Sequence, residues 1–209
     1  MSDRRQGRRQ AVGDLKRELI LAAARRVFEA EGLEGASLRA IAAAAGYTPA
    51  ALYFHFESKE AIYAEVLRAS LARLGEKVAH AVARATSPPA RLRAAAMAFF
   101  GFYAENPRDL DLGFYLFRGG MRPQGLGPAR DEALNAALAA ALRPIGAAAE
   151  ALGASRAAAK LLTVDCFAHA AGLLLLTHTG RIRMFGAAPA RRMAAYVEAQ
   201  ITQLRGGQR

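Results

Sequence analysis

Apolar residues recur along this chain at intervals of three and four positions, which is the spacing of helices that bury one face. The earliest run is expected to begin near Asp14 and to end at Gly32, because glycine accepts the left-handed conformation that ends many helices. Its apolar face consists of Ile20, Ala23, Ala24, Val27 and Phe28.

Two short helices follow, and capping residues mark their ends. Ser37 is a favourable N-cap, and Gly46 closes the helix that Ser37 starts. Thr48 then caps a third helix, with Pro49 at the first helical position, where a missing N–H does no harm. This third helix is expected to include PAALYFHF, residues 49–56. Two short helices joined by a tight turn form a helix-turn-helix, whose second helix lies in the DNA major groove.

The remainder of the chain is also predicted to be helical. Alanine, which has the highest helix propensity, dominates it, while the β-branched runs typical of strands are nearly absent. Ser58 is expected to cap a long helix, and Pro144 to kink or break a later one. The predicted helices cover residues 59–85, 90–105, 108–117, 129–153, 155–180 and 190–205, with a Gly- and Pro-containing loop at 121–128. The predicted fold class is therefore all-α, with about nine helices.

The chain carries a formal net charge of +11. Two explanations stay open: an arginine-rich composition that leaves basic solvated faces, or an anionic partner such as nucleic acid or a membrane surface. Residues 1–13, with Arg4, Arg5, Arg8 and Arg9, are expected to form a basic disordered arm. Such an arm either enters a minor groove or only adds nonspecific affinity.

One cysteine, Cys166, excludes a disulfide within the chain and suits a reducing cytoplasm. No apolar run follows the basic N-terminus, so no secretory signal is predicted. The apolar run at residues 161–177 contains Asp165 and His169 and is short for a membrane span, so we expect a buried helix of a soluble protein. Cys166 and His169 are three positions apart, but nothing nearby completes a set of metal ligands. No metal, cofactor or redox role is expected.

A longer segment carries a specific resemblance. AAARRVFEAEGLEGASLRAIAAAAGYTPAALYFHFESKEAIYAEVL, residues 22–67, resembles the DNA-binding region of the TetR family of bacterial transcriptional regulators. The matching features are the Phe28–Gly32 spacing, the Ser37-Leu38-x-x-Ile41-Ala42 helix, Ala45-Gly46, Leu52-Tyr53, His55-Phe56 and Ser58-Lys59-Glu60. The resemblance implies a helix-turn-helix DNA-binding domain at 14–60 and an effector-binding and dimerisation domain at 61–209. Beyond about residue 70, only helix number and length match.

The third helix then divides its side chains between core and DNA. Leu52 and Phe56, four positions apart, are expected to face a small core that includes Phe28 and Ile41.

Other rings of this helix are expected to point elsewhere. By resemblance, Tyr53 and His55 hydrogen-bond DNA phosphates; the alternative is that these rings are also core. Phe54 is left open.

Four further residues are expected to contact DNA. Ser37 and Thr48 stand at helix N-termini, where the hydroxyl, the free N–H groups and the dipole all favour a phosphate. Lys59 follows the Ser58 cap and is either a phosphate contact or a solvated surface lysine. Arg39 projects away from the apolar face of its helix and is the candidate for a bidentate contact to guanine.

The sequence departs from the usual family pattern at the turn. Tyr47 stands where a small aliphatic residue is common, and Pro49 and Ala50 give the recognition helix almost no hydrogen-bond donors. Pro49 and Ala50 are expected to touch thymine methyl groups, so base readout depends on Arg39 and Thr48, with the N-terminal arginines as further candidates.

The effector pocket that the resemblance implies is expected among aromatic residues. Rings crowd two segments, residues 97–103 and 110–117, and form either ordinary core or an apolar ligand site. Asp165 and His169, four positions apart, need polar partners, which are either each other or a ligand. The candidate effector-binding residues are Phe99, Tyr103, Phe114, Phe117, Asp165 and His169.

The last two helices are predicted to form a homodimer as a four-helix bundle. The stripe expected to meet the partner is Met193, Tyr196, Val197, Gln200, Ile201 and Leu204. A two-fold dimer allows a helix-turn-helix to read both half-sites of a palindromic operator in double-stranded DNA.

The leading interpretation is a cytoplasmic transcriptional repressor, released from its operator by a small, largely apolar or aromatic effector. A nonspecific DNA-binding or membrane adaptor is the first alternative. A helical enzyme is the second, but the sequence has no Glu-x-x-His pair, no His-Glu-x-x-His, no Gly-x-Ser-x-Gly and no Gly-x-x-x-x-Gly-Lys. No enzymatic activity and no membrane partner are therefore predicted.

Overall fold

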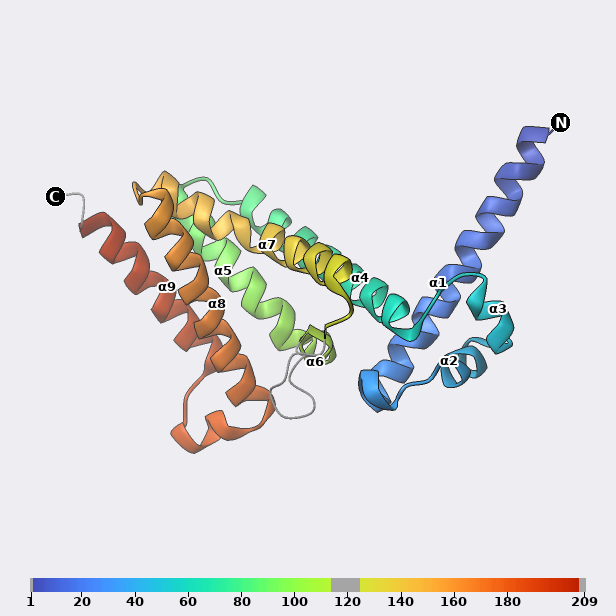
Figure 1. The fold of residues 1–209 in the computed structure, drawn as a ribbon. Helices are drawn as coiled ribbons and strands as arrows, with labels where there is room; N and C mark the ends of the chain where they lie inside the picture. Colours follow the sequence, from blue (N-terminus) through green and yellow to red (C-terminus); the bar gives the residue numbers. More distant parts are fainter. Residues whose placement is uncertain (1, 114–124, 207–209) are drawn as a thin grey trace. The chain divides into compact units, whose positions relative to one another are not determined.

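The computed structural model describes residues 2–113 and 125–206, and every regular element in them is helical (Figure 1). The α-helices are α1 (Ser2–Gly35), α2 (Leu38–Ala45), α3 (Pro49–Tyr53), α4 (Lys59–Ala83), α5 (Pro88–Glu105), α6 (Pro107–Gly113), α7 (Pro128–Ala151), α8 (Arg156–His178) and α9 (Pro189–Gly206), with a 3₁₀ turn η2 (Arg181–Phe185). This confirms the all-α fold class and the expected number of helices over the described residues.

The chain divides into two compact units. The first comprises Met1–Ala69 and Leu110–Leu134, and the second comprises Ser70–Asp109 and Asn135–Arg209. The division into compact units falls within α4. The reason is that the first turns of α4 belong to the core of the first unit, where Ile62 is fully buried.

The core of the first unit is small and aromatic. Phe28, Ile41 and Leu52 are at most 1% exposed and Phe56 is 5% exposed, as predicted for Leu52 and Phe56. Tyr63 of α4 adds a ring that the sequence had not assigned. It meets Phe28 edge to face with centroids 4.8 Å apart, and its hydroxyl donates to the Leu112 carbonyl over 2.8 Å.

The N-terminal segment differs from the prediction. Residues expected to form a disordered arm belong to α1, which begins at Ser2 and not near Asp14. Arginine, glutamine and alanine in this segment are adequate helix formers, and no proline interrupts them. Gly32 does interrupt the helical geometry as expected, with φ at 71°.

In the second unit, α5, α8 and α9 pack against one another. Helix α7 continues through Pro144 without a break, so of the predicted kink or break only a kink is left open. Among the residues described, α8 is the one helix long and apolar enough to cross a membrane. This is weak evidence for a membrane protein, since a packed helix of a soluble protein meets the same criterion.

Candidate nucleic-acid interface

The turn between α2 and α3 is built from the capping residues that the sequence indicated. The Ser37 hydroxyl accepts a hydrogen bond from the Ala40 amide over 3.1 Å. Gly46 adopts φ at 73°, and its N–H reaches the carbonyls of Ala42 and Ala43. No neighbour lies within 4 Å of the position that a Gly46 Cβ would take, so only its backbone conformation calls for glycine there.

The next helix, α3, is shorter than predicted. The Thr48 hydroxyl accepts from the Ala51 amide over 3.3 Å, and Pro49 occupies the first turn. The helix ends at Tyr53, and the amides of His55 and Phe56 both bond to the Leu52 carbonyl, over 2.8 and 2.9 Å. Phe56 is buried as predicted, but it reaches the core from this turn and not from the end of a longer helix.

Most of the predicted DNA-contacting side chains are accessible. Ser37, Arg39, Thr48, Pro49, Ala50 and Tyr53 are exposed, and His55 is partly exposed. Tyr53 is 61% exposed, which fits a contact residue better than a core residue. Phe54, left open by the sequence, is 89% exposed and is therefore not core. The Ser37 and Thr48 hydroxyls accept at the helix caps and retain one donor each for a further partner.

Lys59, predicted as a phosphate contact or a solvated surface lysine, is bonded within the protomer. Its ammonium donates to the carbonyls of Leu33 (2.9 Å), Ala36 (3.3 Å) and Glu34 (3.4 Å). A lysine has three N–H donors, and three carbonyl oxygens surround this one. Lys59 thus ties the start of α4 to the segment that links α1 and α2.

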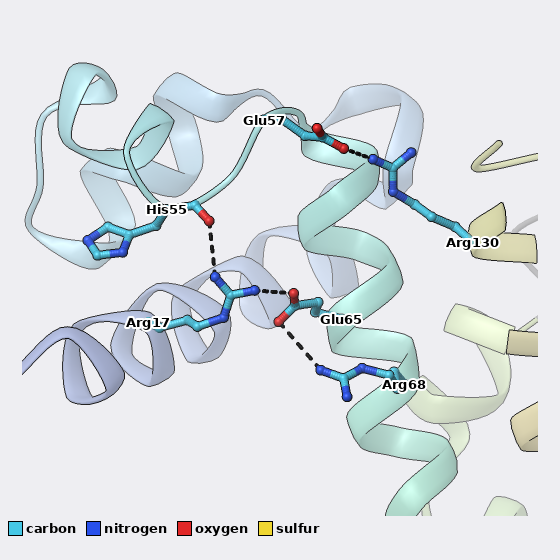
Figure 2. Close-up of polar contacts among 6 residues, drawn as sticks. All are labelled: Arg17, His55, Glu57, Glu65, Arg68 and Arg130. Atoms are coloured by element: carbon cyan, nitrogen blue, oxygen red, sulfur yellow. Dashed lines mark hydrogen bonds and ion pairs between the residues drawn. The ribbon is translucent and has the colours of Figure 1, made fainter. Parts of the chain in front are cut away.

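Arg17 of α1 is the central residue that sequence reasoning missed. Its Nη1 donates to the His55 carbonyl over 3.0 Å, and its Nη2 forms an ion pair with Glu65 (Figure 2). The guanidinium also lies over the Phe56 ring, 4.3 Å from the centroid. Arg17 and Glu65 are 48 positions apart, so no local motif could have indicated the pair.

A second arginine joins the same turn to the start of α7. Arg130 forms an ion pair with Glu57 and donates to the Leu126 carbonyl over 3.0 Å. In Figure 2 the His55 ring points away from Arg17, while Arg68 approaches the other Glu65 oxygen at 3.8 Å. These side chains line an open cleft of about 600 Å³ within the first unit.

The predicted effector residues in the second unit are only partly brought together. Phe99 and Tyr103 are buried and meet edge to face at 5.3 Å, and Phe99 also meets Phe167 of α8 at 5.7 Å. Burial, together with the Asp109 carboxylate, raises the pKa of Tyr103, which keeps this phenol neutral. Phe114 and Phe117 lie outside the described residues.

Asp165 and His169 lie on another side of α8. Asp165 is exposed, and the His169 ring stacks on Tyr196 of α9 with centroids 4.1 Å apart and planes at 15°. Residues two positions apart in a helix point about 200° apart, so His169 faces away from the side where Phe167 meets Phe99. Desolvation is the main cause that lowers the pKa of His169. The His169 ring therefore lies apart from the aromatic cluster, and the role of Asp165 and His169 in effector binding stays a prediction.

The α9 stripe predicted for the dimer is also partly used within the protomer. Met193, Val197 and Ile201 are at most 3% exposed, so no partner can cover them. On α8, the other helix predicted for the dimer, Leu161, Val164 and Leu175 are 64%, 54% and 62% exposed; α1 and η2 also carry exposed apolar side chains.

Known proteins share part of the sequence of this chain and its fold. Residues 20–66 match the family model described as bacterial regulatory proteins, tetR family. The transcriptional activator FasR of Mycolicibacterium smegmatis is 37% identical over 101 residues, which are 48% of this chain and 46% of FasR. The transcriptional repressor AcnR of Corynebacterium diphtheriae is 37% identical over 65 residues, 31% of this chain and 34% of AcnR. The matches thus span half or less of these relatives.

The fold similarity extends over nearly the whole chain. The regulator FadR of Bacillus subtilis, solved with stearoyl-CoA, superposes with a TM-score of 0.65 at 15% identity, covering 91% of this chain and 98% of FadR. At that identity the comparison establishes the fold alone. Sequence match, helix-turn-helix geometry and fold agree, and residues 20–66 are a DNA-binding region of the tetR family of bacterial regulatory proteins.

Proposed function

We propose that the chain is a ligand-responsive transcriptional repressor that acts as a cytoplasmic homodimer on a palindromic operator. The observation that carries the proposal is the capped helix-turn-helix, which holds Ser37, Arg39, Thr48 and Tyr53 at the surface of a chain with net charge +11. Named relatives include both an activator and a repressor of transcription. Repression is the simpler choice because it requires only that the dimer occupies the operator.

The proposed readout separates positioning from specificity. Tyr53 and His55, with the Ser37 and Thr48 hydroxyls, contact phosphates and set the register of the protein on DNA. Arg39 reads a guanine in the major groove, because a guanidinium matches the two acceptors of its edge. Pro49 and Ala50 contribute apolar contact to thymine methyl groups.

The proposed dimer uses α8 as its main contact. Leu161, Val164 and Leu175 recur at helical spacing and leave an apolar surface that one protomer does not cover. A two-fold axis beside α8 would place the stripe against its own copy, which is a self-complementary interface. Tyr196, Gln200 and Leu204 of α9 are partly exposed and would extend this contact.

The proposed effector is largely apolar. The cluster of Phe99, Tyr103 and Phe167 supports an apolar site, since its phenol stays neutral. The B. subtilis FadR structure contains stearoyl-CoA, which recommends acyl-CoA thioesters and aromatic acids as the first probes. Such a ligand can release DNA only if it binds the DNA-incompetent conformation more tightly.

One experiment tests the DNA-binding part of the proposal. Purified protein is used to select genomic fragments, which are sequenced, and the selected site is titrated against a scrambled site over a range of salt. A specific regulator should prefer its site by at least about a thousandfold at physiological salt. Equal affinity for both DNAs would instead identify a nonspecific DNA-binding adaptor.

A further inference from the structure

The guanidinium of Arg17 joins three segments that are distant in sequence. It belongs to α1, it donates to the carbonyl of His55 in the turn after α3, and it pairs with Glu65 in the second turn of α4. It also covers the face of Phe56, the side chain that anchors this turn in the core. Figure 2 shows Arg17 lying between the His55 carbonyl and Glu65.

The contact with His55 is made through the backbone. A hydrogen bond to a main-chain carbonyl fixes the path of the chain and is independent of the side chain at that position. Tyr53 and Phe54, both exposed, immediately precede this carbonyl. The orientation of their side chains therefore depends on where Arg17 holds the turn.

The contact with Glu65 extends this control to α4. The Arg17 and Glu65 side chains are 38% and 22% exposed, so the pair is partly shielded from water. The neighbouring pair of Arg130 and Glu57 is more open, because the Glu57 side chain is 73% exposed. Exposed pairs contribute little, whereas a charged group bonded to a carbonyl and a carboxylate in a partly buried site contributes more.

We propose that Arg17 is a positioning residue for DNA recognition, which holds the turn after α3 and transmits the position of α4 to that turn through Glu65. This proposal rests on the proposed DNA-binding function and adds the side chains that fix the position of the turn after the recognition helix. Arginine suits the task because its planar fork can serve two acceptors and a ring face together, which a lysine ammonium cannot do.

The sharpest test is the sign of the effect of Glu65→Gln. Removing a negative charge near DNA should strengthen binding if only long-range electrostatics matters. The positioning model predicts the reverse, with Glu65→Gln binding the selected operator about three- to tenfold more weakly than the wild-type dimer. Tighter binding by Glu65→Gln would overturn the proposal.

The salt dependence separates positioning from direct phosphate contact by Arg17. Loss of one phosphate contact reduces the slope of log K against log salt by about 0.9. Arg17→Gln is expected to weaken operator binding at an unchanged slope. The double variant, Arg17→Gln with Glu65→Gln, should bind the operator no more weakly than Arg17→Gln alone. A slope reduced by about one unit, or additive losses in the double variant, would contradict the proposal.

Two variants provide matched controls. Lys16→Gln removes a neighbouring exposed cation of α1, and Glu57→Gln removes an exposed acid from the same turn. Both are expected to change operator affinity by less than about twofold. If Lys16→Gln weakened operator binding as much as Arg17→Gln, or Glu57→Gln as much as Glu65→Gln, charge alone and not position would account for the loss of affinity.

Hydrogen exchange gives a readout that does not need DNA. The amides of His55 and Phe56, which bond to Leu52, should exchange faster in Glu65→Gln and Arg17→Gln while amides of α2 keep their protection. Unchanged exchange at His55 and Phe56 would overturn the positioning role. Because hydrogen exchange is measured without DNA, it distinguishes failure of the positioning role from failure of the proposed DNA-binding function.

Discussion

The ammonium group of Lys59 lies 2.9 Å from the carbonyl oxygen of Leu33. The first residue of α4 is thereby hydrogen-bonded to the C-terminal end of α1. In the sequence, its position after the Ser58 cap had made Lys59 a candidate for a contact to DNA phosphate. In the structure the same charge satisfies backbone acceptors near Gly32, where the helical bonding of α1 is interrupted.

Replacing Lys59 should therefore affect stability first. Lys59→Met leaves carbonyl oxygens without their donor and should lower the free energy of unfolding by about 1–2 kcal/mol. The salt slope of DNA binding should remain that of the wild type. Urea unfolding and a salt titration measure the two quantities; unchanged stability with a slope reduced by about 0.9 would restore the phosphate role.

Arg39→Ala should relax base preference at one position in each half-site. Arg39 is exposed on α2 and absent from the core, so its removal should leave stability within about 0.5 kcal/mol of wild type. The loss of discrimination at that position should be about 1–3 kcal/mol. Sequencing of DNA selected by each protein measures this, with Lys16→Gln as the charge-matched control. If the selected sequences are identical for Arg39→Ala and wild type, Arg39 does not read a base.

A charge on the exposed stripe of α8 should disrupt the dimer. Val164→Glu would place a carboxylate in the proposed interface, where it is desolvated without a partner. Sedimentation should show a protein of half the mass, with helix content unchanged. Ala79→Glu, at an exposed alanine of α4, is the control and should sediment as wild type. A dimeric Val164→Glu would place the interface elsewhere.

Cys166 should be inert in the folded protein. Burial is the main cause that raises its pKa to about 12, with a further contribution from the charge of Asp165. Only about one thiol in ten thousand is then ionised at pH 8, and the thiolate is the reactive species. Iodoacetamide should label Cys166 slowly in native protein and rapidly in urea. Rapid labelling without denaturant would support a redox role.

The sequence predicted local features better than distant contacts. Ser37, Gly46 and Thr48 were assigned correctly because capping depends on neighbours within about four positions. The pair of Arg17 and Glu65 escaped notice, since many arginines and glutamates in this chain could have paired. Composition also could not tell which apolar residues of α8 would be covered. Leu161 and Leu162 are adjacent leucines, yet the first is exposed and the second buried.

The five-residue length of α3 has a consequence for the proposed search of DNA. A helix this short cannot sustain itself, because the cost of nucleation exceeds what so few internal hydrogen bonds return. The formation of α3 therefore depends on the Thr48 cap at one end and on the burial of Leu52 and Phe56 at the other. If the proposed dimer binds DNA as we infer, melting of α3 would let it pass wrong sequences with fewer contacts. A matching site would then be recognised by the ordering of α3 that it induces.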